Sequence, residues 1–226
     1  MAINRQRLWK DPLAAVLGTW LAIFGTSAEA QIDAYTASYC EPTAETRLLY
    51  TNRAYEIERK PADAPPLYYT YKILAPSGRS QHVERAGQFL FDDSSDHWDL
   101  QTSSNEIQDF WPLQPGKELD LHRINRRTNV TDNVSFLVLG LEPIGRGLNM
   151  HLSWKIRRLD GYTDGTQSFQ YLWYAPDICT LSAFTDSQHR LVRLLRVLRP
   201  GDRDYDRPLK VEQHYLYFAD TNERVK

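Results

Sequence analysis

The sequence predicts a mostly β, antiparallel protein with few short helices, and three observations support this fold class. Short runs rich in Tyr, Val, Ile, Leu, Phe and Thr alternate with turn residues along the chain. Residues 147–159, GLNMHLSWKIRRL, show the clearest period-two alternation of apolar and polar side chains. Residues 134–141, VSFLVLGL, are almost wholly apolar, which is typical of a central, well-covered strand.

The strands follow one another along most of the chain. We expect them, in order, at residues 47–59, 66–74, 81–91, 117–126, 134–141, 147–159, 168–176 and 211–220. A PADAP turn separates the first two, and Pro115-Gly116 precedes the fourth. In 147–159 the alternation places one set of side chains on the apolar face (Leu148, Met150, Leu152, Trp154, Ile156) and another on the polar face (Asn149, His151, Ser153, Lys155, Arg157).

Residues 190–199 fit two interpretations. An arginine at every third position, from Arg190 to Arg199, favours a cationic amphipathic helix that could touch a membrane. The position of this run after ICTLSAFT and the turn DSQH favours instead the second strand of a hairpin. We favour the strand, and arginines of this kind are typical of a solvated edge strand.

The first thirty residues have the pattern of a secretory signal peptide. A basic start precedes the apolar run LAAVLGTWLAIFG and an Ala28-Glu29-Ala30 exit, so cleavage is expected before Gln31. The apolar run is shorter than the roughly 20 residues that span a bilayer. Residues 31–226 are therefore expected to form a single β-rich domain, exported to the periplasm as a soluble protein. Secretion is the alternative, because Asn129 and Asn133 begin Asn-x-Thr and Asn-x-Ser patterns.

The charge balance excludes one class of partner. Lys and Arg number 27, Asp and Glu number 29, and the net charge is −2. Such a chain offers no field for nucleic acid. Charged residues such as Glu56, Arg157 and Arg193 also interrupt the expected strands. They argue against an integral membrane protein that crosses with strands.

The two cysteines predict a structural disulfide. Cys40 and Cys179 both lie after the expected cleavage site, and an even cysteine count in an exported chain favours a disulfide over catalysis or metal binding. The stretch YLWYAPDICTL, residues 171–181, is then a buried strand, a Pro-Asp turn and a cysteine bonded to the N-terminal segment.

Candidate catalytic and metal sites are weak. The acidic segment FDDSSDHWD, residues 91–99, fits a turn better than a cation site, and GDRDYDRP, residues 201–208, lacks the glycine and glutamate of a calcium loop. No hydrolase or phosphate-binding motif occurs. No metal, cofactor or catalytic residue is therefore predicted, and an enzyme is disfavoured. One alternative stays open, a hydrolase in which His97 or His151 meets an Asp and a Ser in space.

Aromatic strands supply the candidate ligand-binding residues. These are Trp173 and Tyr174 in one strand and Tyr69 and Tyr71 in another. Aromatic side chains usually fill the core, but on a curved sheet they can also line an apolar pocket.

Three segments carry a family resemblance. FWPLQPGKEL (110–119), DGYTDGTQSF (160–169) and YLWYAPD (171–177) resemble uncharacterised proteobacterial periplasmic proteins of a domain-of-unknown-function family. That family is similar in architecture to the outer-membrane lipoprotein carriers. The resemblance implies a single curved antiparallel sheet, or half-open barrel, over an apolar cavity. The chain departs from the pattern after Asp177, where Ile178-Cys179 replaces a glycine turn.

The predicted function is a binding or structural role in the cell envelope, with a lipid or other apolar small molecule, or an envelope protein, as partner. A protein-interaction module of a surface or secretion system is the main alternative to this role.

Overall fold

The computed structural model describes residues 40–58, 68–74, 81–86, 91–92, 98–125, 127–161, 165–212 and 215–226. All of them belong to one unit, Ala37–Lys226. The expected signal peptide, residues 1–30, lies outside the described residues, so its cleavage stays a prediction. In the part of the chain that the structure describes, no helix combines the length and the apolar character needed to span a membrane.

Strands dominate this unit, although the segments 47–59 and 211–220, each expected to form one strand, each contribute to two. They are β1 (Arg47–Tyr50), β2 (Ala54–Ile57), β3 (Tyr68–Leu74), β4 (Gln81–Ala86), β5 (Phe91–Asp92), β6 (Trp98–Leu100), β7 (Glu118–Asn125), β8 (Thr131–Ile144), β9 (His151–Gly161), β10 (Gln167–Ala175), β11 (Thr180–Thr185), β12 (Leu191–Leu198), β13 (Leu209–Glu212), β14 (Tyr215–Phe218) and β15 (Glu223–Arg224). A short helix, α2 (Ser104–Asp109), and a 3-10 turn, η2 (Gly147–Asn149), interrupt them.

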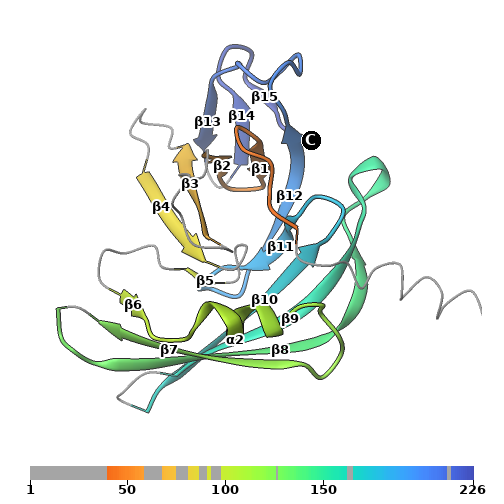
Figure 1. Ribbon diagram of the computed structural model, residues 1–226. Coiled ribbons are helices and arrows are strands. Elements are labelled where there is room, and N and C mark those ends of the chain that lie inside the picture. The colour runs from red at the N-terminus through yellow and green to blue at the C-terminus, as the bar shows by residue number, and fades with distance from the viewer. Residues whose placement is uncertain are drawn as a thin grey trace, which may run out of the picture. The chain divides into compact units, whose positions relative to one another are not determined.

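Twelve strands form one antiparallel sheet, in the order β5-β4-β3-β2-β1-β12-β11-β10-β9-β8-β7-β6. Strands that are adjacent in this order are also consecutive in sequence except at one place, where β1 pairs with β12 and Arg47 lies opposite Leu198. The sheet is strongly curved and does not close into a barrel (Figure 1). The predicted fold class, a single curved antiparallel sheet with few short helices, is confirmed.

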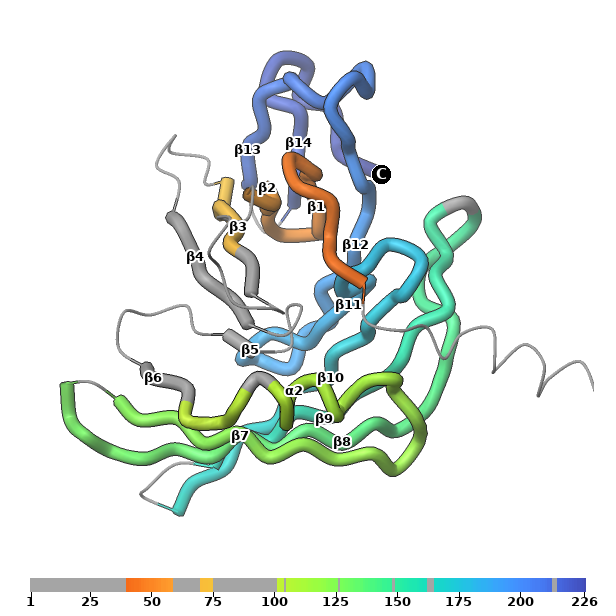
Figure 2. The backbone as a smooth tube through the Cα atoms, in the orientation of Figure 1, coloured from red at the N-terminus to blue at the C-terminus, as the bar shows by residue number. Residues whose placement is uncertain are grey.

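Residues 191–198 form strand β12, so the strand interpretation of the arginine-rich segment is confirmed. The expectation of an edge strand is wrong, because β12 pairs with β1 on one side and with β11 on the other. Figure 2 shows β12 running between β1 and β11. Arg193 tolerates this interior position because its side chain remains exposed.

The main core lies on the inner face of the sheet, which we define as the face that α2 covers (Figure 1). Ile107 and Phe110 of α2 and the following Trp111 pack there, with the Phe110 ring 6.4 Å from that of Phe136 on β8. The helix begins with a capping box, in which Ser103 and Glu106 satisfy each other's backbone N–H groups. The opposite face is called the outer face below.

A second, three-stranded sheet, β13-β14-β15, covers the outer face of β1 and β2. Leu49 and Ala54 are fully buried against Leu216 and Phe218 of β14. The second sheet covers the face of β1 that would otherwise meet water. Residues 48–50 are therefore all buried and show no apolar–polar alternation.

The disulfide between Cys40 and Cys179 is present, as predicted, with a Cα–Cα distance of 5.4 Å. Cys179 ends the turn between β10 and β11 at a positive φ of 52°. Cys40 Sγ lies 3.1 Å from the hydroxyl oxygen of Tyr174. The bond therefore fixes the start of the described chain to the edge of the main core.

Candidate functional site

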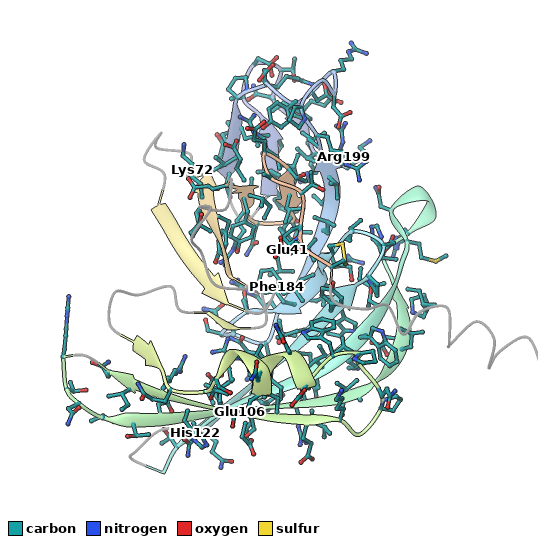
Figure 3. The ribbon with its side chains drawn as sticks, in the orientation of Figure 1. Glu41, Lys72, Glu106, His122, Phe184 and Arg199 are labelled. Carbon is teal, nitrogen blue, oxygen red and sulfur yellow. A yellow bond between two sulfur atoms is a disulfide. The ribbon has the colours of Figure 1, made fainter. Side chains whose placement is uncertain are left out.

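A pocket of about 230 Å³ opens on the inner face of the sheet, between the β1–β2 turn and strands β9 to β11. Its lining combines aromatic rings, two arginines and several polar side chains: Tyr50, Arg53, Tyr55, Arg158, Gln170, Leu172, Leu181, Phe184, Thr185, Asp186 and Ser187. Phe184 of this lining is labelled in Figure 3. The pocket is therefore assembled from two parts of the chain more than 100 residues apart in sequence.

Aromatic rings form one wall of this pocket. The ring of Tyr50 lies edge-on to Phe184 at 5.4 Å and to Tyr55 at 5.5 Å between centroids. The Tyr50 hydroxyl donates to the Leu181 carbonyl at 2.7 Å, which joins β1 to β11 across the inner face. Tyr50 and Tyr55 are buried and Phe184 is half-buried, so the wall is packed against the core on one side and partly open to a ligand at Phe184.

Arg53 projects into the pocket from the tight turn between β1 and β2. Its guanidinium carbon lies 5.7 Å from the centroid of the Phe184 ring. Its Nε donates to Asn52 Oδ1 and its Nη1 to the Tyr55 hydroxyl, both at 3.3 Å. Within the described residues, no carboxylate oxygen lies within ion-pair distance of Arg53. The pocket thus contains a cation without a counter-ion among those residues.

Arg158 is the second pocket cation, and a buried ion network holds it in place. Arg158 donates to both oxygens of Asp160, with the shortest contact at 2.7 Å from Nη2 to Oδ1. Arg123 lies 3.4 Å from Asp160 and 2.5 Å from Asp132. The side chains of Asp132 and Asp160 are only 2% and 7% exposed, so the carboxylates are desolvated and depend on these arginines.

Asp186 forms the rim of the pocket, in the turn between β11 and β12. Burial acts to raise its pKa, but hydrogen bonds from the Arg190 backbone and side chain and from the Gln188 backbone outweigh burial. The pKa of Asp186 is therefore held below its ordinary value. The ionised carboxylate of Asp186 accepts these three hydrogen bonds, so its protonation should weaken them and make the turn at the pocket rim less ordered.

We expect the Asp186→Asn variant to be about 1 kcal/mol less stable than the wild type at neutral pH. A depressed folded-state pKa contributes stability above the unfolded-state pKa, near the ordinary value of 3.8, and that contribution is lost as the pH falls further. The difference between the two proteins should therefore narrow below pH 4 in urea unfolding at a series of pH values. Asp206→Asn, in an exposed loop, is the control for net charge. A difference that stays constant down to pH 3 would contradict the role of the ionised carboxylate.

The predicted ligand residues lie on different faces. Tyr174 is 1% exposed in the main core, with its ring 4.9 Å from that of Trp111. Trp173 faces the other way, and the Lys155 ammonium lies 5.4 Å from the centroid of its ring. Tyr71 is 1% exposed and contacts the ring of Tyr55 at 4.9 Å, one ring away from the pocket. The side chain of Tyr69 lies outside the described residues.

Trp173 belongs to a row of aromatic rings on the outer face of β10. The Tyr171 ring lies 6.1 Å from Trp173 and 5.7 Å from Phe169, which also stacks on His189 at 4.7 Å. Phe169 is 44% exposed, whereas Trp173 is only 7% exposed. A ligand-binding role for the four predicted aromatic residues stays a prediction.

The structure pairs the His151 side chain with an aspartate and the Ser153 side chain with a second serine. His151 Nδ1 lies 2.7 Å from Asp177 Oδ2. Ser153 Oγ, however, lies 2.7 Å from Ser182 Oγ and donates to the His151 carbonyl at 3.2 Å. Ser153 was expected on a polar face but is fully buried, because Ser182 satisfies its hydroxyl within the sheet. The Ser153 hydroxyl therefore faces these partners and not solvent.

The acidic segments contain no metal-binding cluster within the described residues. There, no three His, Cys, Asp or Glu side chains gather closely enough to hold a metal ion. Asp204 forms ion pairs with Arg196 at 2.8 Å and with Arg207 at 3.1 Å, as expected for a charged loop. The segment 93–97, with His97, lies outside the described residues.

Sequence reasoning missed the pocket arginines, although one of them left a readable signal. Trp154, Ile156 and Arg158 alternate along β9 and therefore share the inner face. A cation that continues an apolar face is a candidate for a buried ion pair or a ligand contact. Arg53 left no such signal, because a turn residue has no face that the sequence pattern can assign.

The chain matches no protein-family model and no curated protein. Among solved structures it is similar to the hypothetical lipoprotein YmcC from Escherichia coli (K12), with 14% identity and a TM-score of 0.41 over 80% of this chain and 93% of that chain. A likeness at this level identifies neither a family nor a ligand. The resemblance to periplasmic proteins stays an expectation, and the case for a function rests on the geometry of the pocket.

Proposed function

We propose that this protein is an exported binding protein that holds a small molecule in the inner-face pocket. The observation that carries the proposal is the pocket itself, in which an aromatic wall meets two arginines, a glutamine and hydroxyl groups. Ligand sites combine apolar walls with a few polar groups that fix orientation, and this lining has that composition.

The size and chemistry of the pocket favour a small, partly polar ligand over a lipid chain. Pockets for drug-sized ligands typically measure roughly 300–1,000 Å³. The inner-face pocket, at about 230 Å³, is smaller than that range. Six of its lining residues carry a polar or charged side chain, namely Arg53, Arg158, Gln170, Thr185, Asp186 and Ser187. An acyl chain would desolvate them without replacing their hydrogen bonds. The ligand is therefore a compact molecule rather than a long hydrocarbon.

The disulfide supports export as part of the same proposal. Intramolecular disulfides persist in oxidising compartments such as the bacterial periplasm. Cys40 and Cys179 are the only cysteines of the chain, and they are bonded to each other. Together with the signal-peptide pattern of residues 1–30, this favours a periplasmic binding protein.

Native mass spectrometry of the protein purified from a bacterial periplasm tests the proposal. We expect a small-molecule adduct that is released when the protein is denatured. Gln170→Trp should abolish the adduct, because the indole would occupy the pocket that the half-buried Gln170 lines. Gln167→Trp is the matched control, since Gln167 lies on the same strand, is exposed and is outside the lining. An adduct retained by Gln170→Trp would place the ligand elsewhere. The proposal would be overturned if the spectrum showed only the mass of the protein without an adduct and if none of the probes described below bound.

A further inference from the structure

The pocket lining carries more positive than negative side chains. Its lining contains two guanidinium groups, on Arg53 and Arg158, and one carboxylate, on Asp186. Asp186 is already bonded to Arg190, with 2.8 Å between Arg190 Nη2 and Asp186 Oδ2. The ion pair with Asp160 neutralises the charge of Arg158. Among the residues that the structure describes, Arg53 is therefore the lining cation without a carboxylate partner, which leaves its charge for a ligand to neutralise.

Arg53 is also placed to bind a planar anion. A guanidinium carries five N–H donors in a fixed fork, which matches the two oxygens of a carboxylate. Its hydrogen bonds within the described residues use Nε and Nη1 only, each at 3.3 Å, which leaves Nη2 as a donor. The side chain is half-buried, so a bound anion would be partly shielded from water and attracted more strongly than at an open surface.

The surroundings of Arg53 specify the rest of the ligand. Phe184 lies beside the guanidinium, and Tyr50, Leu172 and Leu181 continue the apolar part of the lining. A flat, apolar body would pack against these side chains while its acidic group reached Arg53. An inorganic ion such as phosphate would leave the same surfaces unfilled.

We infer that the pocket selects a small organic anion with a flat apolar body, in which Arg53 binds the anionic group and the Phe184 wall binds the body. This inference rests on the proposed function, because it names the ligand class of the same pocket. Arg158 is held in a fixed orientation by Asp160, which already neutralises its charge, so the selection of an anion rests on Arg53.

Three probes of nearly equal shape separate charge from shape: benzoate, benzamide and benzylamine. Their binding is measured by chemical-shift changes in the isotope-labelled protein, after removal of any co-purified ligand by unfolding and refolding with the disulfide intact. We expect benzoate to bind at least tenfold more tightly than benzamide, and benzylamine not to bind. Arg53→Gln should weaken benzoate at least tenfold, as expected when a charge-assisted hydrogen bond is lost.

Matched variants make the result specific. Arg193→Gln removes the same charge from an exposed position outside the lining and should leave benzoate binding unchanged. Arg53→Lys keeps the charge but loses the fork, so it should retain an intermediate affinity. The shift pattern of the unliganded variants shows whether each is folded, and Arg53→Lys provides the comparison if Arg53→Gln is not.

The outcomes separate this inference from the proposed function. If benzamide or benzylamine binds as well as benzoate, and Gln170→Trp blocks it, the pocket binds ligands but does not select anions, and the inference is overturned. If benzoate binds equally well to Arg53→Gln and the wild type, Arg53 is not the contact and the inference is overturned as well. If no probe binds and no adduct is found in the purified protein, the inference and the proposed function both fail.

Discussion

Replacing Asp160 by alanine should lower the free energy of unfolding by about 3–5 kcal/mol, because it leaves the Arg158 guanidinium buried without its carboxylate. Asp160 is bonded to Arg158 and lies 3.4 Å from Arg123, and its side chain is 7% exposed. Water therefore cannot readily replace the lost carboxylate. Urea unfolding followed by far-UV circular dichroism measures the effect.

Two further variants identify the cause of this destabilisation. Asp120→Ala removes an exposed carboxylate from β7 and should change stability by no more than about 0.5 kcal/mol. The double variant Arg158→Met, Asp160→Leu removes both charges and should be more stable than Asp160→Ala, because no unpaired guanidinium is left at this position. If the double variant is the less stable of the two, the cost arises from lost packing and not from an unpaired charge.

Removing the disulfide should destabilise the protein by about 2–5 kcal/mol. Cys40 and Cys179 are separated by 139 residues in sequence. Closing a loop of that length removes on the order of 5 kcal/mol of denatured-state entropy in the simplest chain model, and measured effects are commonly smaller. The comparison is between the wild type and Cys40→Ala, Cys179→Ala in thermal and urea unfolding.

Reduction of the wild-type protein provides the internal control for this experiment. With dithiothreitol present, the wild type should unfold at the same urea concentration as the double variant, because both then lack the cross-link. Dithiothreitol should not affect the double variant, since the chain has only these two cysteines. An unchanged unfolding midpoint on reduction would mean that the bond does not constrain the unfolded chain.

Much of the fold could be predicted from the sequence, because strand periodicity and turn residues are local signals. The run from Leu191 to Leu198 shows the limit of such signals. Its arginines suggested an edge, but its place between β1 and β11 depends on a pairing with residues about 150 positions away. Ser153 shows a second limit, because a serine reads as polar whether it meets water or another buried hydroxyl.

The candidate site was less predictable than the fold. Aromatic composition pointed to Trp173 and Tyr174, yet adjacent residues of a strand face opposite sides, and these two lie on different faces. Tyr71 lies in contact with Tyr55, one of the residues that line the inner-face pocket. Arg53 and Asp186 lie in turns, where the direction of a side chain is set by the folded chain and not by periodicity.

The pairing of β1 with β12 has a consequence for the order in which the protein folds. Strands β1–β5 and β6–β12 are each a series of sequential neighbours, which form early because their contacts are local. The seam between the two series joins Arg47 to Leu198 and should form late, since it closes the longest loop. Tyr50, Arg53 and Tyr55 lie on one side of that seam and the rest of the pocket lies on the other. The pocket therefore exists only once the two halves have joined. A ligand that contacts both halves would stabilise the joined state and slow their separation during unfolding.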